Sequence, residues 1–132
     1  MLKGIGIDII EVQRIEKALE RTPRFQQRLF TEREITQCRS KPVPAESFAA
    51  RFAAKEAVFK TLGSGWQLGW SSIEIISDAL GRPQVTLEGK AADKAVELGI
   101  QEVKVSLTHT RQYAAAVAIA VGAVAPGLVV SR

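Results

Sequence analysis

Alternating apolar and polar positions predict strands near both ends of the sequence. Residues 4–10 alternate glycine or aspartate with isoleucine, and residues 102–107 alternate polar with apolar side chains, a period of two that is typical of strands. Residues 113–121 form an uncharged run rich in alanine, valine and isoleucine, which predicts a strand buried on both faces. Two further apolar runs, residues 72–77 and 84–87, predict strands, and the turn residues 80–83 between them predict that the two strands form a hairpin.

Two helical patterns follow the first strand. Residues 12–19 place apolar side chains at positions 12, 15, 18 and 19, which is the spacing of one helix face. Thr31 and Glu34 have the Thr-x-x-Glu form of a capping box, in which each side chain accepts a hydrogen bond from the backbone N–H of the other residue. A second helix is therefore predicted to begin near Glu32. It should end before Pro42, because proline disfavours helix in the residue before it.

The strongest helical pattern covers residues 45–62, which are rich in alanine, lysine, glutamate and arginine. Gly63 follows, a residue suited to the left-handed turn that ends many helices. Its backbone N–H is also a candidate contact for an anion, although a helix cap explains the glycine more simply. A shorter helix is predicted over residues 91–98, closed by Gly99. This order of strands and helices predicts an α+β fold.

The composition is that of a globular domain, with 132 residues, of which 46% are hydrophobic and 24% charged. No apolar run approaches the roughly 18 residues of a membrane-spanning helix, and no signal sequence opens the chain. We therefore expect no membrane segment and a cytoplasmic location. Residues 123–132 are expected to form a frayed, flexible tail. Cys38 is the only cysteine, which excludes an internal disulfide, and an unreactive thiol on a helix is favoured over a reactive one.

The net charge of +4 is concentrated in the first half of the chain. Residues 1–62 contain 12 lysines and arginines against 8 acidic residues, whereas residues 63–132 contain 6 of each. A basic region of this kind indicates an anionic partner, which can be a nucleic acid, an acidic protein or a phosphorylated small molecule. Charge alone does not choose among these three.

Two carboxylates and several cations make up the first candidate site. Asp8 ends an apolar strand, where it either caps the following helix or serves as an oxygen ligand for Mg²⁺. Glu56 and Lys60 lie four residues apart on the long helix, a spacing that also suits an ordinary surface ion pair worth about 0.3–0.5 kcal/mol. Arg51 and Lys55 are expected to share one broad side of that helix with Lys60, where Lys55 either contacts phosphate or pairs with a carboxylate across the site. Asp8 and Glu56 match the number of carboxylates that Mg²⁺ takes at phosphate sites, and Mn²⁺ accepts the same oxygens.

A second polar group lies where the strand at 102–107 ends. Ser106 and Thr108 contribute hydroxyls, His109 is the only histidine, and Arg111 follows closely. A single histidine is more often structural than catalytic. Hydroxyl, imidazole and guanidinium groups together nevertheless suit hydrogen bonding to phosphate.

Three segments together resemble the signature of a known enzyme family. Residues 6–8 (GID), 52–60 (FAAKEAVFK) and 106–116 (SLTHTRQYAAA) are similar to the signature segments of the 4′-phosphopantetheinyl transferases, in the same order and at similar separations. The resemblance extends over residues 4–121 and is to the small bacterial type, the holo-[acyl-carrier-protein] synthases. It implies a fold in which an antiparallel sheet packs against a long central helix, with residues 1–132 as one domain.

This resemblance implies a reaction. The phosphopantetheine arm of coenzyme A would be transferred to a serine of acyl carrier protein, releasing adenosine 3′,5′-bisphosphate, in fatty acid biosynthesis. The nucleophile is on the carrier, which fits a chain without a Ser/His/Asp arrangement, because phosphoryl transfer needs mainly positioning and charge neutralisation. By the family pattern, Asp8 and Glu56 would hold Mg²⁺ and Lys60 would neutralise the pyrophosphate. Either Glu56 or a metal-bound water would accept the serine proton.

The resemblance also implies a coenzyme A site and an assembly. The small type is a homotrimer whose active sites lie between subunits. Ile10 stands where the larger, pseudo-dimeric members typically carry an acidic residue, which leaves two protein carboxylates for the metal. The residues expected to contact coenzyme A, most of them through its phosphates, are Arg51, Lys60, Gly63, Ser106, Thr108 and His109.

A basic surface for the acidic carrier is predicted on and after the first helix. Arg14 and Arg21 are seven residues apart and share a helix face, and Arg24 and Arg28 follow. Opposite charges would steer the carrier to this surface, with Phe25 as an apolar anchor. The alternative is a solvated helix face whose arginines are balanced by neighbouring glutamates.

Two other classes of function compete with this interpretation. Another Mg²⁺-dependent enzyme acting on phosphate esters would share Asp8 and Glu56 but would need no protein acceptor. A nucleic-acid-binding module would use the same arginines, yet the chain lacks the interleaved aromatic and basic residues of such modules. We rank both below the transferase and expect no nucleic-acid partner.

Overall fold

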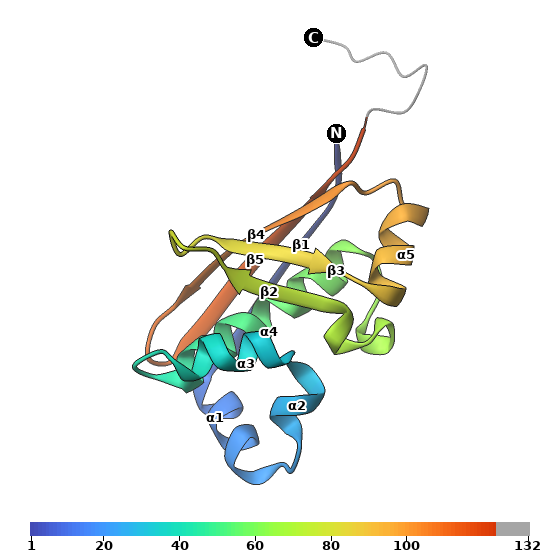
Figure 1. Ribbon diagram of the computed structural model, residues 1–132. Helices are drawn as coiled ribbons and strands as arrows, with labels where there is room; N and C mark the ends of the chain where they lie inside the picture. The colour runs from blue at the N-terminus through green and yellow to red at the C-terminus, as the bar shows by residue number, and fades with distance from the viewer. Residues whose placement is uncertain (124–132) are drawn as a thin grey trace.

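A three-stranded antiparallel sheet and one long helix form the centre of the structure (Figure 1). The computed structural model describes residues 1–123, so most of the tail predicted over 123–132 lies outside the described residues. The sheet has the order β1 (Leu2–Glu11), β5 (Tyr113–Val121) and β4 (Glu102–His109). The helix α4 (Pro44–Thr61) packs against one face of this sheet. The predicted α+β class and the predicted sheet-on-helix arrangement are confirmed.

Small side chains allow the sheet and the helix to approach closely. Ala114, Ala116, Ala118 and Ala120 of β5 are all buried on the face toward α4. On β1 the same role falls to glycine, since a Cβ at Gly6 would meet the carbonyl oxygen of Ala57 and lie 2.9 Å from Thr61 Oγ1. The backbone of β1 therefore lies directly on the surface of α4.

The predicted hairpin is confirmed as a separate two-stranded sheet. β2 (Ile73–Ser77) pairs antiparallel with β3 (Pro83–Leu87), and α5 (Gly89–Glu97) follows. Ile73 and Ile75 are fully buried in the same core as the middle of α4. The hairpin and α5 therefore enlarge the core of the central sheet and helix. Two short 3₁₀ helices, η1 (Trp66–Leu68) and η2 (Trp70–Ser72), connect α4 to the hairpin.

Three short helices gather at one end of the molecule (Figure 1). They are α1 (Val12–Arg21), α2 (Phe25–Leu29) and α3 (Glu32–Arg39). A second core cluster joins them to the first part of α4 and includes the fully buried Phe48 and Cys38. Cys38 thus lies on a helix, as predicted, and burial raises the pKa of its thiol to about 11.

The capping box predicted at Thr31 is confirmed. Thr31 Oγ1 accepts from the backbone N–H of Glu34 at 3.2 Å, and Glu34 Oε1 accepts from the backbone N–H of Thr31 at 2.9 Å. The helix α2 was not predicted, because its five residues are too few to show a period. Within residues 1–123, no helix has both the length and the apolar character that crossing a bilayer requires.

The prediction that β5 is buried on both faces is wrong for the single chain. Its alanines at even positions are buried, but Val117 and Ile119 at odd positions are partly exposed. They lie on the outer face of the sheet, beside Ile5 and Ile7 of β1, which are 65% and 68% exposed. The apolar run in the sequence thus reflects a sheet face that the described part of the chain leaves open.

Candidate active site

Asp8, Glu56 and Lys60 come together where β1 crosses α4. Lys60 Nζ lies 3.4 Å from Asp8 Oδ1 and donates a hydrogen bond of 2.9 Å to the carbonyl oxygen of Ile7. Glu56 lies one helical turn before Lys60 and is close enough to Asp8 for the two carboxylates to repel each other. Residues 48 positions apart in sequence therefore form one cluster. The sequence prediction that these three residues meet is supported by this geometry.

The alternatives considered for these residues do not hold. The N-cap residue of α1 is Glu11, so Asp8 does not cap the helix that follows β1. In the described residues, Lys60 forms its salt bridge with Asp8 on the neighbouring strand β1, and not with Glu56 on its own helix. The cluster is therefore a contact between two elements and not a local helix pair.

The alternation of β1 aims Asp8 at the helix. Gly4, Gly6 and Asp8 share the inward face of the strand, because successive side chains alternate between faces. The close approach at Gly6 sets the height of the strand above α4 and hence the position of Asp8, two residues later. The Asp8 side chain is 19% exposed and that of Lys60 is 54% exposed, so the cluster opens to solvent on the lysine side.

Electrostatics at this cluster favour a bound cation. The pKa of Glu56 is raised, first by burial and second by the neighbouring Asp8 carboxylate, while Lys60 opposes the shift. A divalent cation between the carboxylates would relieve this repulsion. Within the described residues no group of three metal-ligating side chains occurs, so the protein offers two carboxylates here. This donor set fits Mg²⁺, which commonly takes one or two carboxylates and completes its shell with water and phosphate.

Arg51 and Lys55 lie away from this cluster. Arg51 is 5% exposed and donates to the carbonyl oxygen of Ile75 at 2.7 Å, to Gln37 Oε1 at 3.0 Å and to Ser77 Oγ at 3.3 Å. The prediction that Arg51 and Lys55 share one side of α4 with Lys60 is wrong. Arg51 lies nine residues before Lys60, and in a helix with roughly 3.6 residues per turn this separation makes the two side chains point to opposite sides. A phosphate contact of Arg51 remains a prediction.

Lys55 is fully buried and pairs with a carboxylate. Its Nζ lies 2.6 Å from Glu34 Oε1, and both side chains have no exposed area. Burial lowers the pKa of Lys55, and the Glu34 carboxylate opposes that shift. The sequence had left open whether Lys55 contacts phosphate or pairs with a carboxylate. The pairing is observed, and the partner is the capping-box residue of α3.

The polar residues of β4 do not join the cluster within one chain. His109 Nδ1 lies 3.2 Å from Glu46 Oε1 in the first turn of α4, and ten residues of helix, about 15 Å, separate Glu46 from Glu56. Ser106 and Thr108 are exposed and lie on the outer face of the sheet, opposite the face that carries Asp8. The contact between His109 and Glu46 was not predicted, since nothing in the local sequence links residues 63 positions apart.

Gly63 ends α4 as a helix cap. It adopts φ +66°, its N–H donates to Lys60 O at 3.0 Å, and the N–H of Ser64 donates to Phe59 O at 3.1 Å. These two bonds are those of the Schellman motif. The simpler of the two interpretations of Gly63 is thus confirmed. Its contact with coenzyme A remains a prediction.

The predicted carrier-docking residues surround α1 and α2. Four arginines are exposed, and within residues 1–123 none of them forms a salt bridge. Phe25 is partly buried and contacts the Phe30 ring edge-on, with 6.5 Å between ring centroids. The basic surface therefore exists, with Phe25 turned partly into the core below it. The four arginines are Arg14, Arg21, Arg24 and Arg28.

Comparisons with known proteins place the chain among the relatives of one family. The family model described as the 4′-phosphopantetheinyl transferase superfamily matches residues 4–118. The holo-[acyl-carrier-protein] synthase of Caldanaerobacter subterraneus is 50% identical over 119 residues, which cover 89% of this chain and 94% of that protein.

Solved structures show the same arrangement of elements. The holo-ACP-synthase of Plasmodium yoelii matches with a TM-score of 0.82 and 35% identity, covering 93% of this chain and 97% of that one. The Helicobacter pylori holo-[acyl-carrier-protein] synthase, solved in complex with coenzyme A, matches with a TM-score of 0.77 and 33% identity. That match covers 89% of this chain and 99% of the other.

Proposed function

The chain belongs to the 4′-phosphopantetheinyl transferase superfamily, and we propose that it acts as a holo-[acyl-carrier-protein] synthase. It transfers the 4′-phosphopantetheine arm of coenzyme A to a serine of apo acyl carrier protein and releases adenosine 3′,5′-bisphosphate. The observation that carries the proposal is the meeting of Asp8, Glu56 and Lys60 at the crossing of β1 and α4. Two carboxylates and a cation in one solvent-open cluster suit the handling of a pyrophosphate.

The chemistry divides between the carrier and this chain. The carrier serine oxygen forms a bond to the phosphorus that bears pantetheine, and the bond from that phosphorus to the bridging pyrophosphate oxygen breaks. The electron pair of the broken bond leaves with adenosine 3′,5′-bisphosphate, whose new charge Lys60 neutralises. The serine proton passes to the Glu56 carboxylate. Support for this role is the place of Glu56 in the cluster, beside Asp8 and one helical turn before Lys60.

Mg²⁺ is part of the proposal, held by Asp8 and Glu56. When bound, the ion neutralises the negative charge of the pyrophosphate as it is cleaved. Mn²⁺ takes similar oxygen ligands and would substitute. The cytoplasmic location and the role in fatty acid biosynthesis belong to the same proposal and rest on the family resemblance.

We also propose a homotrimer with active sites between subunits. Support comes from the outer face of the central sheet, where Ile5, Ile7 and Ile9 are 65%, 68% and 66% exposed. Adjoining apolar residues of this kind usually mark an interface. Ser106 and Thr108 lie on the same face, turned away from Asp8 of their own chain. A neighbouring copy whose Asp8–Glu56–Lys60 cluster packed against this face would receive the hydroxyls of Ser106 and Thr108 at that cluster.

The exposed arginines of α1 and α2 complete the proposal as the carrier-docking surface. Acyl carrier proteins are acidic, and opposite charge raises the rate of encounter and fixes orientation. These arginines have no carboxylate partner among the described residues, so their charge is available to a partner protein.

One experiment tests the reaction and the metal together. The purified protein is incubated with apo acyl carrier protein, coenzyme A and Mg²⁺, and the carrier is followed by intact mass. We expect a gain of one phosphopantetheine, which EDTA, Asp8→Ala and Glu56→Ala each abolish. Consumption of coenzyme A in the absence of the carrier would instead identify an enzyme that acts on phosphate esters without a protein acceptor. No gain of mass with any carrier would contradict the proposed function.

A further inference from the structure

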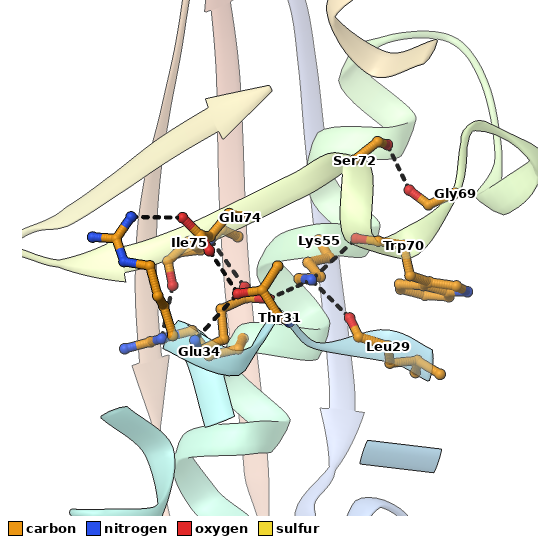
Figure 2. Close-up of polar contacts among 11 residues, drawn as sticks. Leu29, Thr31, Glu34, Lys55, Gly69, Trp70, Ser72, Glu74 and Ile75 are labelled. Atoms are coloured by element: carbon orange, nitrogen blue, oxygen red, sulfur yellow. Dashed lines mark hydrogen bonds and ion pairs between the residues drawn. The ribbon is translucent and has the colours of Figure 1, made fainter. Parts of the chain in front are cut away.

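A buried ion pair lies on the opposite side of α4 from the face against β1, and the proposed reaction does not use it (Figure 2). Lys55 of α4 and Glu34 of α3 have no exposed side-chain area, and their charged atoms are 2.6 Å apart. Charges so fully removed from water are rare, because the loss of hydration is unfavourable unless the two partners are well arranged. The pair therefore calls for an account beyond ordinary packing.

The arrangement satisfies the donors of the ammonium group. Lys55 Nζ donates to the carbonyl oxygen of Leu29 at 2.7 Å and to that of Trp70 at 3.1 Å, besides its contact with Glu34. The Phe30 ring lies 5.3 Å from the same nitrogen, measured to the ring centroid. Three donors thus meet three acceptors from three different segments. The ammonium group connects α4 to the end of α2, to η2 and to α3.

The carboxylate extends these connections to the hairpin. Glu34 Oε1 accepts from the backbone N–H of Thr31, and Oε2 accepts from that of Ile75 in β2 at 3.0 Å. Thr31 Oγ1 in turn donates to Glu74 Oε2 at 2.6 Å (Figure 2). Because both carboxylate oxygens are in use, a shift of Glu34 would disturb three elements at once.

Among the connected elements, α2 is a helix without a buried residue. It is a single short helix of five residues, and an isolated helix of that length is not stable in water. Its last residue, Leu29, is the acceptor of the Lys55 ammonium. Lys55 immediately precedes Glu56 and lies five residues before Lys60 on the same helix. One side chain therefore links the end of α2 to the helix that carries two of the three clustered residues.

We propose that the Glu34–Lys55 ion pair is a positioning element that holds α2, with Arg24 and Arg28, at a fixed place relative to Glu56 and Lys60. The proposal rests on the proposed function, in which these arginines dock the carrier. The carrier serine must reach the cluster while the carrier is held at α2, and a loose α2 would weaken that delivery. Coenzyme A binding would depend on α2 far less. Lys55 and Glu34 touch no substrate and act only through α2.

A purely stabilising role makes a different forecast. Replacing a buried ion pair by neutral groups of similar size is often tolerated or even stabilising. If the pair only contributed to stability, the melting temperature would change and the kinetic constants of the folded enzyme would not. The two roles are therefore separated by kinetics and by local hydrogen exchange.

The test uses the double variant Glu34→Gln/Lys55→Met in the full chain. The matched control is Lys94→Met/Glu97→Gln, which removes a partly exposed pair with 3.6 Å between its charged atoms on α5. Hydrogen exchange is followed for the backbone amide of Arg28, which donates a hydrogen bond of 2.9 Å to the carbonyl oxygen of Arg24.

We expect the Arg28 amide to exchange about tenfold faster in the double variant, while amides in the centre of α4 stay protected. The KM for the carrier should rise about tenfold and that for coenzyme A should stay within about twofold. The α5 control should match the wild type in both measurements. An unchanged Arg28 exchange rate, or equal changes in the two KM values, would overturn the proposal.

Two provisions keep the result decisive. If the double variant does not fold, Glu34→Gln alone is used. The Arg28 exchange rate and the KM for the carrier must then each rise by about threefold or more. Unchanged values in that folded variant would also overturn the proposal. Hydrogen exchange needs no substrate, so it tests the anchoring of α2 even if the wild-type protein fails to modify the carrier. Such a failure would count against the proposed function instead.

Discussion

Adding one methyl group at Gly6 should damage catalysis more than it damages folding. A Cβ at this position would come well inside 3.0 Å of the Ala57 carbonyl oxygen and 2.9 Å from Thr61 Oγ1, whereas ordinary contact begins at 3.4 Å. The Ala57 oxygen belongs to the helix backbone and cannot turn aside. β1 must therefore move away from α4, and Asp8 moves with it, because it lies two residues later on the same face.

The expected size of the effect follows from this displacement. Overpacking of this kind costs about 1–3 kcal/mol of stability. A shift of roughly 1 Å in a positioned catalytic group costs about 10²-fold in rate. We therefore expect Gly6→Ala to remain folded, with kcat/KM lowered about 10²-fold and with weaker binding of Mg²⁺.

Gly4→Ala is the matched control. Its Cβ would lie 2.5 Å from Thr61 O, so it also pushes β1 away from α4, but four residues from Asp8 instead of two. Thermal melts should show a similar loss of stability in both variants, and the intact-mass assay should show the larger loss of activity in Gly6→Ala. A folded Gly6→Ala enzyme with kcat/KM within about threefold of wild type would refute the reasoning. So would a Gly4→Ala enzyme that is equally impaired.

Four further outcomes are expected. The pKa of Glu56 is raised in the folded state, so the metal-free protein loses stability as pH rises through that pKa. Mg²⁺ should therefore raise Tm more at neutral pH than at mildly acidic pH. Equal Mg²⁺-induced shifts of Tm at the two pH values would count against Glu56 as a ligand. Cys38, buried with a thiol pKa of about 11, should resist iodoacetamide in the folded protein and react on unfolding, as mass spectrometry would show. Reversal of Arg14 and Arg21 to Glu should raise the KM of the carrier well above any change for coenzyme A, and an unchanged carrier KM in steady-state assays would remove the docking role. Ile7→Glu places a charge on the exposed apolar sheet face and should dissociate the proposed trimer, so a wild-type sedimentation coefficient for this variant would contradict that assembly.

Local patterns predicted most elements of this fold, and long-range contacts explain what they missed. The alternation in β1, the capping box at Thr31 and the composition of α4 are signals within a few residues of one another, and each was confirmed. The pairing of Glu34 with Ile75 joins residues 41 positions apart, and no short segment encodes it.

The candidate site shows the same division. Asp8, Glu56 and Lys60 were predicted from their residue types and from a family signature, and their meeting depends on β1 lying against α4. Arg51 was expected to share one broad side of the helix with Lys60 because the two lie close in sequence, but nine residues of helix place them about half a turn apart. Its guanidinium is instead used within the core, since burial and partners of a cation are decided by tertiary structure.

The free edge of β2 has its hydrogen-bonding groups occupied by side chains of helices. At Ile75, Glu34 accepts from the backbone N–H and Arg51 donates to the carbonyl oxygen. At Ser77, the Gln37 side-chain amide accepts from the backbone N–H and donates to the carbonyl oxygen. An open strand edge is a template on which a strand from another molecule can pair, and it is a common origin of aggregation. Here the backbone groups that such a strand would need are already bonded. The hairpin is thereby protected from growing into a larger intermolecular sheet, even in a protein whose other sheet exposes an apolar face.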